Sequence, residues 1–389
     1  MRFSPLVERI AGEAADAWKL HSRASRAAKH DPEVILLSVG DPDLDTPKPI
    51  VDRLIESVLA GRTHYSSGLG EPDLREAVAK HYNRKGFSQV SARNVVIVPG
   101  TQNGLFAAAM CLLAQGDEII IPEPMYVTYP GFVGATGASV VSVSLKGEDG
   151  FALHPDDIAR AITPKTRAIL LNSPNNPTGA VIPRETLEAV AELCQQHDLW
   201  LLSDEVYLDL YYSHQPTSAL ALDTMYERTV VVSSLSKSHA MTGWRLGWII
   251  APEALVGHLS NLLSSMMYGA SMFIQDAAVA AFEVPELVET MREIYRSRRE
   301  VMLERCKSMP GLTCLEPEGG MFVMLDVRKT GISATTFAER FFDTQKVSLL
   351  PADAFGPSAK GFLRLSLCVN EAKLHDVCDR LERFLESLD

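Results

Sequence analysis

Five short polar segments follow directly after apolar runs, and each holds side chains that can do chemistry. They offer an amine, carboxylates, amides and hydroxyls, and Arg245 adds a guanidinium eight residues after Lys237. An amine that burial and nearby cations keep neutral is a nucleophile and a proton carrier. Ligands bind beyond the carboxyl ends of the strands in open α/β sheets, so we expect these segments to meet at one sheet edge. The segments are PGTQN (99–103), PEPMYVTYP (122–130), NSPNNPTG (172–179), SDEVY (203–207) and SLSKS (234–238).

The apolar runs themselves predict the sheet that positions these segments. Most show no polar alternation, which is typical of strands that helices bury on both faces. Longer helical stretches separate them, including two amphipathic helices at 50–60 and 72–85. We therefore predict a doubly wound α/β fold with a mainly parallel, seven-stranded sheet. The runs are VVIV (95–98), EIII (118–121), VVSV (140–143), AILL (168–171), LWLL (199–202), TVVVS (229–233) and LGWII (246–250).

A smaller α+β unit is predicted from both ends of the chain. After Pro285 a long charged helix leads to two further strand patterns, MFVMLDV (321–327) and FLRLSL (362–367). A helical stretch at 11–28 and the short run VILLSVG (34–40) are expected to join them. The predicted domains are thus 46–284, and 1–45 together with 285–389. Four arginines on the long helix could form an anion site, but we interpret them as a solvated helix face: Arg292, Arg296, Arg298 and Arg299.

Composition excludes several classes of protein. The chain has 389 residues, 46% of them hydrophobic, and a net charge of −12, so it is neither disordered nor a general binder of nucleic acid. The longest apolar run has ten residues (105–114), whereas a spanning helix needs about 20. No export signal is visible, and the six cysteines lack metal spacing, so we expect reduced thiols, no metal and a cytoplasmic location. Neither a dinucleotide nor a Walker glycine motif is present.

Four motifs occur in an order that resembles the pattern of one known family. They are NNPTG (175–179), SDEVY, SLSKS with its later arginine, and FLRLSL. The chain is similar, from about Val34 to its end, to the fold-type I, pyridoxal-phosphate-dependent class I/II aminotransferases. The resemblance implies pyridoxal 5'-phosphate as cofactor and a homodimer with shared active sites. It also implies ping-pong transfer of an amino group from an amino acid to a 2-oxo acid.

The resemblance also assigns roles around the cofactor ring. Lys237 matches the lysine that forms the Schiff base and then moves the substrate proton. Asp204 would hold the pyridine nitrogen protonated, Tyr207 and Asn176 would bond the phenolic oxygen, and Tyr126 would stack on the ring. Each residue type also has an ordinary use: an exposed lysine, a helix N-cap for the aspartate, and turn formation for the asparagine.

A second set of residues would bind the phosphate and the substrate carboxylate. Arg364 matches the arginine that grips the substrate α-carboxylate through two contacts, with Gly40 and Asn176 beside it. Lying in different domains, Arg364 and Lys237 could be drawn together when substrate binds. An edge-strand arginine and an ordinary loop tyrosine are the alternatives for Arg364 and Tyr65. The phosphate ligands would be Gly100, Thr101, Gln102, Ser234, Ser236, Arg245 and Tyr65 of the neighbouring subunit.

The amino donor is the least constrained feature. Four segments resemble the bacterial arginine–pyruvate transaminases: AWKLHSRA (17–24), EPMYVTYP (123–130), SLSKSHAMTGWR (234–245) and GGMFVMLDV (319–327). Aspartate-specific relatives in one subgroup carry a lysine where this chain has Gln102, which weakens that alternative. A cationic donor would want a carboxylate at the pocket mouth, and Glu13 and Asp16 are candidates, although a solvated helix face is the favoured interpretation of each.

Three other functions remain open on these residues. An aspartate- or aromatic-type aminotransferase would share the whole site. A Cys–S β-lyase would share Lys237, Asp204 and Arg364 but would release pyruvate and ammonia without an acceptor. A ligand-sensing regulator would carry a DNA-binding domain ahead of the core, and only about 33 residues precede the first predicted strand here. A nicotinamide dehydrogenase lacks its glycine fingerprint.

Overall fold

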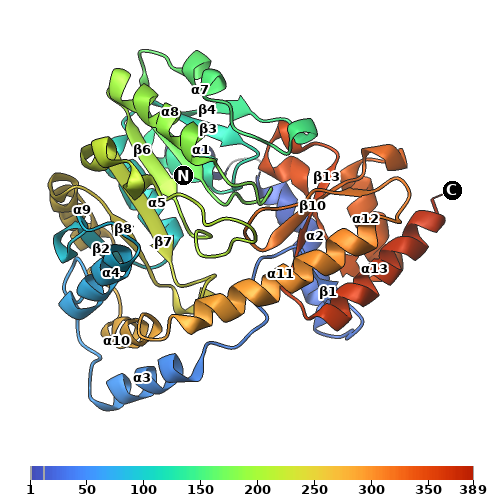
Figure 1. Ribbon diagram of the computed structural model, residues 1–389, viewed down its shortest axis with the longest axis horizontal. Coiled ribbons are helices and arrows are strands. Elements are labelled where there is room, and N and C mark those ends of the chain that lie inside the picture. Colours follow the sequence, from blue (N-terminus) through green and yellow to red (C-terminus); the bar gives the residue numbers. More distant parts are fainter. Residues whose placement is uncertain (1, 12–13, 389) are drawn as a thin grey trace.

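A seven-stranded sheet forms the centre of the larger part of the molecule (Figure 1). The computed structural model describes residues 2–11 and 14–388, and the side chains among them apart from those of 11, 14–17 and 223. The strand order is β2-β8-β7-β6-β5-β3-β4, and only β8 runs antiparallel to its neighbours. The predicted fold class is confirmed. The strands are β2 (Val95–Val98), β3 (Glu118–Glu123), β4 (Ser139–Ser144), β5 (Thr166–Asn172), β6 (Trp200–Asp204), β7 (Thr229–Ser234) and β8 (Gly247–Ile250).

Helices bury both faces of this sheet, which explains why its strands are apolar without alternation. In β2, Val95 and Ile97 face one hydrophobic core and Val96 and Val98 face the other. β4 is the exception, because it pairs with β3 alone at the sheet edge and exposes its serines. The covering helices are α4 (Pro72–Arg84), α5 (Thr101–Leu112), α6 (Tyr129–Thr136), α7 (Pro155–Ala161), α8 (Arg184–Gln196), α9 (Glu253–Met266) and α10 (Met272–Ala281).

The smaller part is built around a four-stranded antiparallel sheet of order β12-β13-β10-β9. The N-terminal segment reaches it, because β1 (Ile35–Leu36) pairs in parallel with β11 (Val347–Ser348). The division into two domains at residues 46 and 285 stays a prediction. The other elements are α2 (Ala14–Ala28), α11 (Glu286–Cys306), β9 (Thr313–Cys314), β10 (Phe322–Asp326), α12 (Ala334–Gln345), β12 (Leu350–Pro351), β13 (Phe362–Ser366) and α13 (Glu371–Glu386).

The arginines of α11 do not all lie on a solvated face, so that interpretation is wrong for part of the set. Arg298 is 4% exposed, bonds both carboxylate oxygens of Asp43 at 2.6 and 2.9 Å, and donates to the carbonyl of Leu367 at 3.0 Å. Arg292 and Arg299 are largely buried and donate to backbone carbonyls as well as to carboxylates. Arg296 pairs with a glutamate one turn away. Because each guanidinium has a carboxylate partner, the set links chain segments and is not an anion site.

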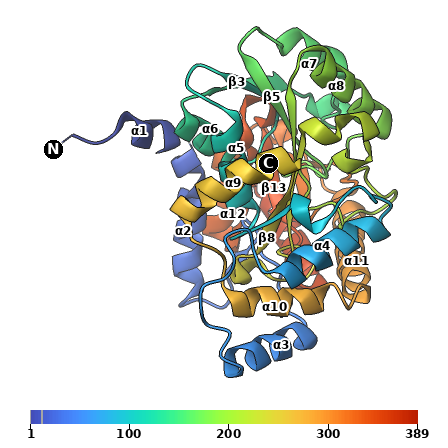
Figure 2. The same ribbon diagram turned by 90° about the vertical axis from the view of Figure 1, so that its left-hand side faces the viewer.

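Two further helices lie at the periphery. Figure 2 shows α1 (Pro5–Ala11) beside α6, against which it packs, and α3 (Lys48–Leu59) beside α10. Within the described chain, no helix combines the length and apolar character needed to cross a bilayer. The six cysteines are all free thiols. No group of three or more histidine, cysteine, aspartate or glutamate side chains in the described residues could hold a metal ion.

Candidate active site

A cavity of about 450 Å³ lies where the carboxyl ends of β5, β6 and β7 face β10 and β13. The five polar segments therefore do meet at one edge, as strand direction predicts. All the predicted site residues line it except Gly100 and Tyr65. The predicted residues on its wall are Gly40, Thr101, Gln102, Tyr126, Asn176, Asp204, Tyr207, Ser234, Ser236, Lys237, Arg245 and Arg364.

Lys237 holds its amine inside this cavity. Nζ donates a hydrogen bond of 2.6 Å to the carbonyl oxygen of Gly40. Burial is the main cause that lowers the pKa of Lys237. Cys368 and Asp41 act against it, and the positive charges of Arg364 and Arg245 make smaller contributions that lower the pKa again. The amine is thus shifted toward its neutral, nucleophilic form. This is not the environment of an ordinary surface lysine.

Asp204 ends β6 and is buried at the bottom of the cavity. Oδ2 accepts a 2.7 Å hydrogen bond from the Tyr129 hydroxyl, and Oδ1 accepts one of 3.2 Å from the Val206 backbone N–H. Burial raises the pKa of Asp204 to about 6, although both hydrogen bonds favour the charged form. The helix N-cap alternative is wrong, because a turn and not a helix follows β6.

Arg364 is fixed before any substrate arrives. It lies in β13, an interior strand between β12 and β10, so the edge-strand alternative is wrong. Nη1 donates to Asn176 Oδ1 at 2.9 Å and Nη2 to the carbonyl of Ser38 at 2.6 Å, while Nε is buried without a partner. Burial lowers the pKa of Arg364 to about 10, which leaves it charged at neutral pH.

Asn176 joins this arginine to the tyrosine at the other side of the site. Its Nδ2 lies 3.4 Å from the Tyr207 hydroxyl, and its backbone N–H donates to Asn172 Oδ1 at 2.8 Å. Asn172 also donates from Nδ2 to the backbone carbonyl of Asp204 at 3.0 Å. The side chain of Asn176 therefore does more than form a turn.

The start of α5 offers free donors for an anion. Thr101 Oγ1 is buried without a partner, and the helix begins at Gly100, whose φ is 83°. A Cβ at Gly100 would lie 2.4 Å from Arg245 Nη2, so only glycine lets this guanidinium reach the helix N-terminus. Arg245 donates from Nη1 to the Thr242 carbonyl at 2.8 Å. A helix N-terminus, an unpartnered hydroxyl and a cation fit a phosphate dianion.

Tyr65 lies outside the cavity, on a loop that faces solvent in the single chain. It is 82% exposed and packs edge-on against Tyr268, which is 63% exposed, with 5.0 Å between ring centroids. The structure therefore does not bring Tyr65 to the other predicted site residues.

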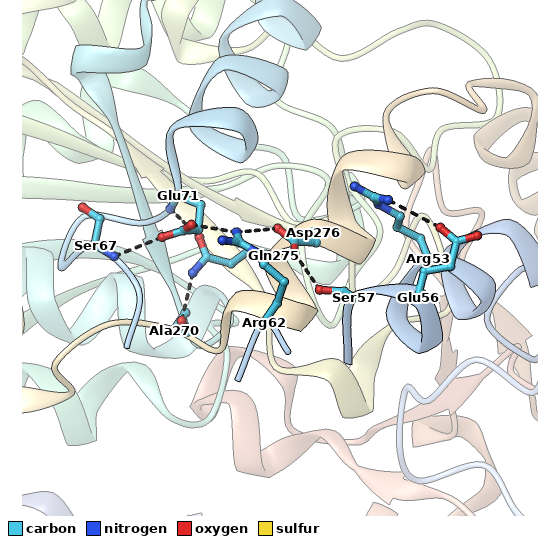
Figure 3. Close-up of polar contacts among 9 residues, drawn as sticks. All are labelled: Arg53, Glu56, Ser57, Arg62, Ser67, Glu71, Ala270, Gln275 and Asp276. Atoms are coloured by element: carbon cyan, nitrogen blue, oxygen red, sulfur yellow. Dashed lines mark hydrogen bonds and ion pairs between the residues drawn. The ribbon is translucent and has the colours of Figure 1, made fainter. Parts of the chain in front are cut away.

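Three charged side chains brace this loop against α10 (Figure 3). Arg62 donates from Nε and Nη2 to the two oxygens of Asp276 at 2.8 and 2.9 Å, and from Nη2 to Glu71 Oε2 at 2.8 Å. Glu71 accepts from the Ser67 backbone N–H at 3.1 Å, and its own N–H donates to Gln275 Oε1 at 2.7 Å. Both ends of the Tyr65 loop are thereby fixed. We call Arg62, Glu71 and Asp276 the loop brace.

Several residues of the cavity wall were not assigned a role from sequence, among them Trp18, Asp41 and Tyr129. Tyr129 stands three residues after Tyr126 in the same turn, and Asp41 directly follows Gly40, so proximity to assigned residues was the available signal. Glu13 lies outside the described residues, and so does the side chain of Asp16.

Comparison with known proteins gives the family. Residues 32–381 match the model of aminotransferase class I and II. The arginine–pyruvate transaminase of Pseudomonas aeruginosa is 50% identical over 98% of this chain and 97% of its own. An aromatic-amino-acid aminotransferase of Thermococcus litoralis is 37% identical over 91% of this chain and 92% of its own.

Solved structures agree with this match. The aspartate aminotransferase of Thermotoga maritima superposes with a TM-score of 0.93 at 33% identity, covering 99% of this chain and all of the other. The resemblance drawn from the motifs is confirmed. The chain is a transaminase and belongs to the class I and II aminotransferase family.

Proposed function

We propose that the protein transfers the α-amino group of L-arginine to pyruvate, with pyridoxal 5'-phosphate as cofactor. The observation that carries the choice of substrates is the 50% identity, over nearly the whole chain, to an arginine–pyruvate transaminase. The chemistry is supported by one cavity that unites a partly buried amine, a buried carboxylate and a buried guanidinium: Lys237, Asp204 and Arg364.

The cavity fits the proposed cofactor at both of its ends. The phosphate would bind at the start of α5, where Thr101 has an unpartnered hydroxyl and Gly100 leaves room for Arg245. Ser234 and Ser236, on the same wall, would add hydroxyl donors, as would the amide of Gln102. Asp204 would face the ring nitrogen. The bound cofactor would supply an electron sink for the negative charge left when the substrate Cα loses its proton.

The protein's own residues would then bind, orient and move protons. The neutral amine of Lys237 would act as nucleophile and afterwards carry the proton that leaves Cα. A protonated ring nitrogen next to Asp204 would favour its carboxylate form, which burial alone disfavours. Tyr207 and Asn176 would hydrogen-bond the phenolic oxygen, and Tyr126 would stack on the ring.

The substrate carboxylate would bind Arg364 in the smaller part of the molecule. The guanidinium is already oriented by Asn176 and Ser38, so little side-chain entropy is lost when the carboxylate arrives. Gly40 would complete this contact through its backbone N–H, while its carbonyl oxygen accepts from Lys237 Nζ. Movement of the smaller part toward the larger would expel water around the reacting atoms.

We also propose a homodimer in which Tyr65 completes the neighbouring subunit's phosphate site. Exposed apolar side chains gather around that loop, on α3 and at the end of α9, and a second copy would cover them. They are Ile55, Val58, Leu59, Met266 and Tyr268. The six free thiols fit a reducing compartment, and we place the reaction in the cytoplasm.

Absorbance spectroscopy tests this proposal and its alternatives. The purified protein with added cofactor should absorb in the visible, and L-arginine should bleach that band until pyruvate restores it. Faster bleaching by aspartate or an aromatic amino acid would reassign the donor. Release of pyruvate and ammonia from cysteine conjugates without an acceptor would indicate the β-lyase. A protein that gains no visible band would contradict the proposed cofactor, and would leave the ligand-sensing function as the alternative.

A further inference from the structure

The rim of the active-site cavity carries a carboxylate and an indole that the proposed reaction leaves without a role: Asp41 and Trp18. We propose that these two side chains bind the cationic end of the amino donor and so select a guanidinium. The inference rests on the proposed function, because it concerns the same cavity. It names the residues that would recognise the side chain of the donor.

Asp41 lies next to the reacting amine. It follows Gly40, whose carbonyl oxygen is 2.6 Å from Lys237 Nζ. Its side chain is solvent-exposed, and Oδ1 accepts a 2.6 Å hydrogen bond from Thr242 Oγ1, which orients the carboxylate on the rim. No cation of the described chain is paired with it. Asp41 is therefore oriented but keeps its negative charge available.

The charges of the cavity explain why a cationic side chain needs this carboxylate. Three basic side chains line the wall, namely Lys237, Arg245 and Arg364, and the charges of the two arginines would repel a guanidinium. In the described part of the wall the carboxylates are Asp41 and Asp204. Asp204 is buried, bonded to Tyr129, and turned toward the ring nitrogen in the proposed function. Asp41 is thus the counter-charge that a guanidinium can reach from solvent.

Trp18 supplies an aromatic surface at the same rim. The indole is partly buried and packs edge-on against His21 on α2, with 5.7 Å between ring centroids. His21 Nδ1 is 2.9 Å from Ser38 Oγ, and the carbonyl of Ser38 accepts from Arg364 Nη2. These contacts connect the indole to Arg364, the arginine that would bind the α-carboxylate.

The chemistry of the ligand follows from this pair. A planar guanidinium stacks on an aromatic face and donates in a fork to a carboxylate, whereas a compact ammonium cannot do both. Figure 2 shows α2 along the side of the smaller part, where β11 and β12 pack against it, so Trp18 is carried on a fixed helix. A donor held by Arg364 at one end and by Asp41 and Trp18 at the other would be bound along its whole length.

L-Citrulline is the matched probe, because it has the length and shape of arginine without the charge. The kcat/KM for L-arginine should exceed that for L-citrulline. Asp41→Asn should lower the arginine value about 10- to 30-fold, at the lower end of the range for a hydrogen bond to a charged group, because Asp41 is exposed. The citrulline value should change much less, so the ratio of the two values should fall by about the same factor. Asp41 also influences the pKa of Lys237, but that effect acts on both donors and cancels in their ratio. Trp18→Leu should lower the arginine value about 3- to 10-fold.

A binding measurement removes catalysis from the test. Holoenzyme is titrated by calorimetry with 5-guanidinovalerate, which is arginine without its amine, and with 5-ureidovalerate, its neutral counterpart. Asp41→Asn should weaken only the guanidino compound, again by about 10- to 30-fold. Asp198→Asn is the control, because it removes the same charge from an exposed carboxylate that is paired with Arg228 and does not line the cavity.

The outcomes separate this inference from the proposed function. Equal losses for the guanidino and ureido compounds, or no loss for either, would overturn the role of Asp41 and Trp18 and leave the arm carboxylates Glu13 and Asp16 as the next candidates. A wild-type enzyme that transaminates without preferring arginine to citrulline would also overturn it, while transamination itself would stand. If no amino acid bleaches the cofactor band, the proposed function fails instead.

Discussion

Tyr129→Phe removes one hydroxyl and should change the protonation of the carboxylate at the heart of the site. The hydroxyl donates a 2.7 Å hydrogen bond to Asp204 Oδ2, and both groups are buried. A hydrogen bond to a charged group contributes about 1.5–3 kcal/mol. Only the 3.2 Å bond from the Val206 N–H would then favour the ionised carboxylate.

The size of the effect follows from the pKa that burial already imposes. The pKa of Asp204 is raised to about 6, and losing a bond of that strength would raise it by about a further 1–2 pH units. At pH 7 half or more of the carboxylates would be protonated in the cofactor-free protein. A neutral acid no longer holds a cationic ring nitrogen, so we expect cofactor affinity and kcat to fall about 10- to 100-fold.

The assay is the dissociation constant of the cofactor, measured by visible absorbance, together with kcat across pH 5–9. The acid limb of the kcat profile should move to higher pH in Tyr129→Phe. Tyr212→Phe is the control: its buried hydroxyl donates to the carbonyl of Gly320 at 2.5 Å and does not line the cavity. It should lower stability and leave the acid limb in place. An unmoved limb and unchanged affinity in Tyr129→Phe would refute the reasoning.

Three further predictions use other parts of the molecule. Lys237→Ala should abolish turnover while some cofactor binding remains, so a bound but unreactive protein in the absorbance assay is the expected result. Arg364→Lys should raise KM for amino acids at least about tenfold, because an ammonium cannot make the two-pronged contact, and unchanged KM would contradict its role. Burial raises the pKa values of Asp204 and Glu205 to about 6 and about 7, above their unfolded values, so both groups favour the folded state most at low pH. Their contribution to the unfolding free energy of the cofactor-free protein should be lost as pH rises from about 4 to 7, by roughly 3 kcal/mol for Glu205 alone. Glu205→Gln should flatten that slope in urea unfolding, and an identical slope would count against it.

Much of the fold could be predicted because the relevant signals are local in sequence. A strand buried on both faces leaves an unbroken apolar run, as VVIV at 95–98 does, and the residues just beyond it must lie at the sheet edge. From the sequence alone, that rule predicts that Lys237 and Asp204 lie close together. The rule fails for β4. Its run is also mostly apolar, but the strand lies at the open edge of the sheet and exposes its serines.

Contacts between distant segments could not be predicted in the same way. Arg298 meets Asp43 across 255 positions, and nothing in the local pattern of α11 distinguishes it from the other arginines of that helix. Tyr129 and Asp204 are 75 positions apart, and a tyrosine in a turn carries no sign that its hydroxyl will reach a carboxylate. Such pairs arise because packing removes both groups from water, after which each must find a partner.

The charge of the cavity could likewise not be predicted from the net charge of the chain. A chain with a net charge of −12 places three cations on one wall, and their mutual repulsion in a partly buried space favours any anion that enters. A phosphate and an α-carboxylate would satisfy two of them, Arg245 and Arg364, and burial and these cations together push Lys237 toward its neutral form. Once those anions are bound, the remaining unsatisfied charge on the rim is the carboxylate of Asp41, so the order of binding itself would turn a cavity that repels guanidinium into one that attracts it.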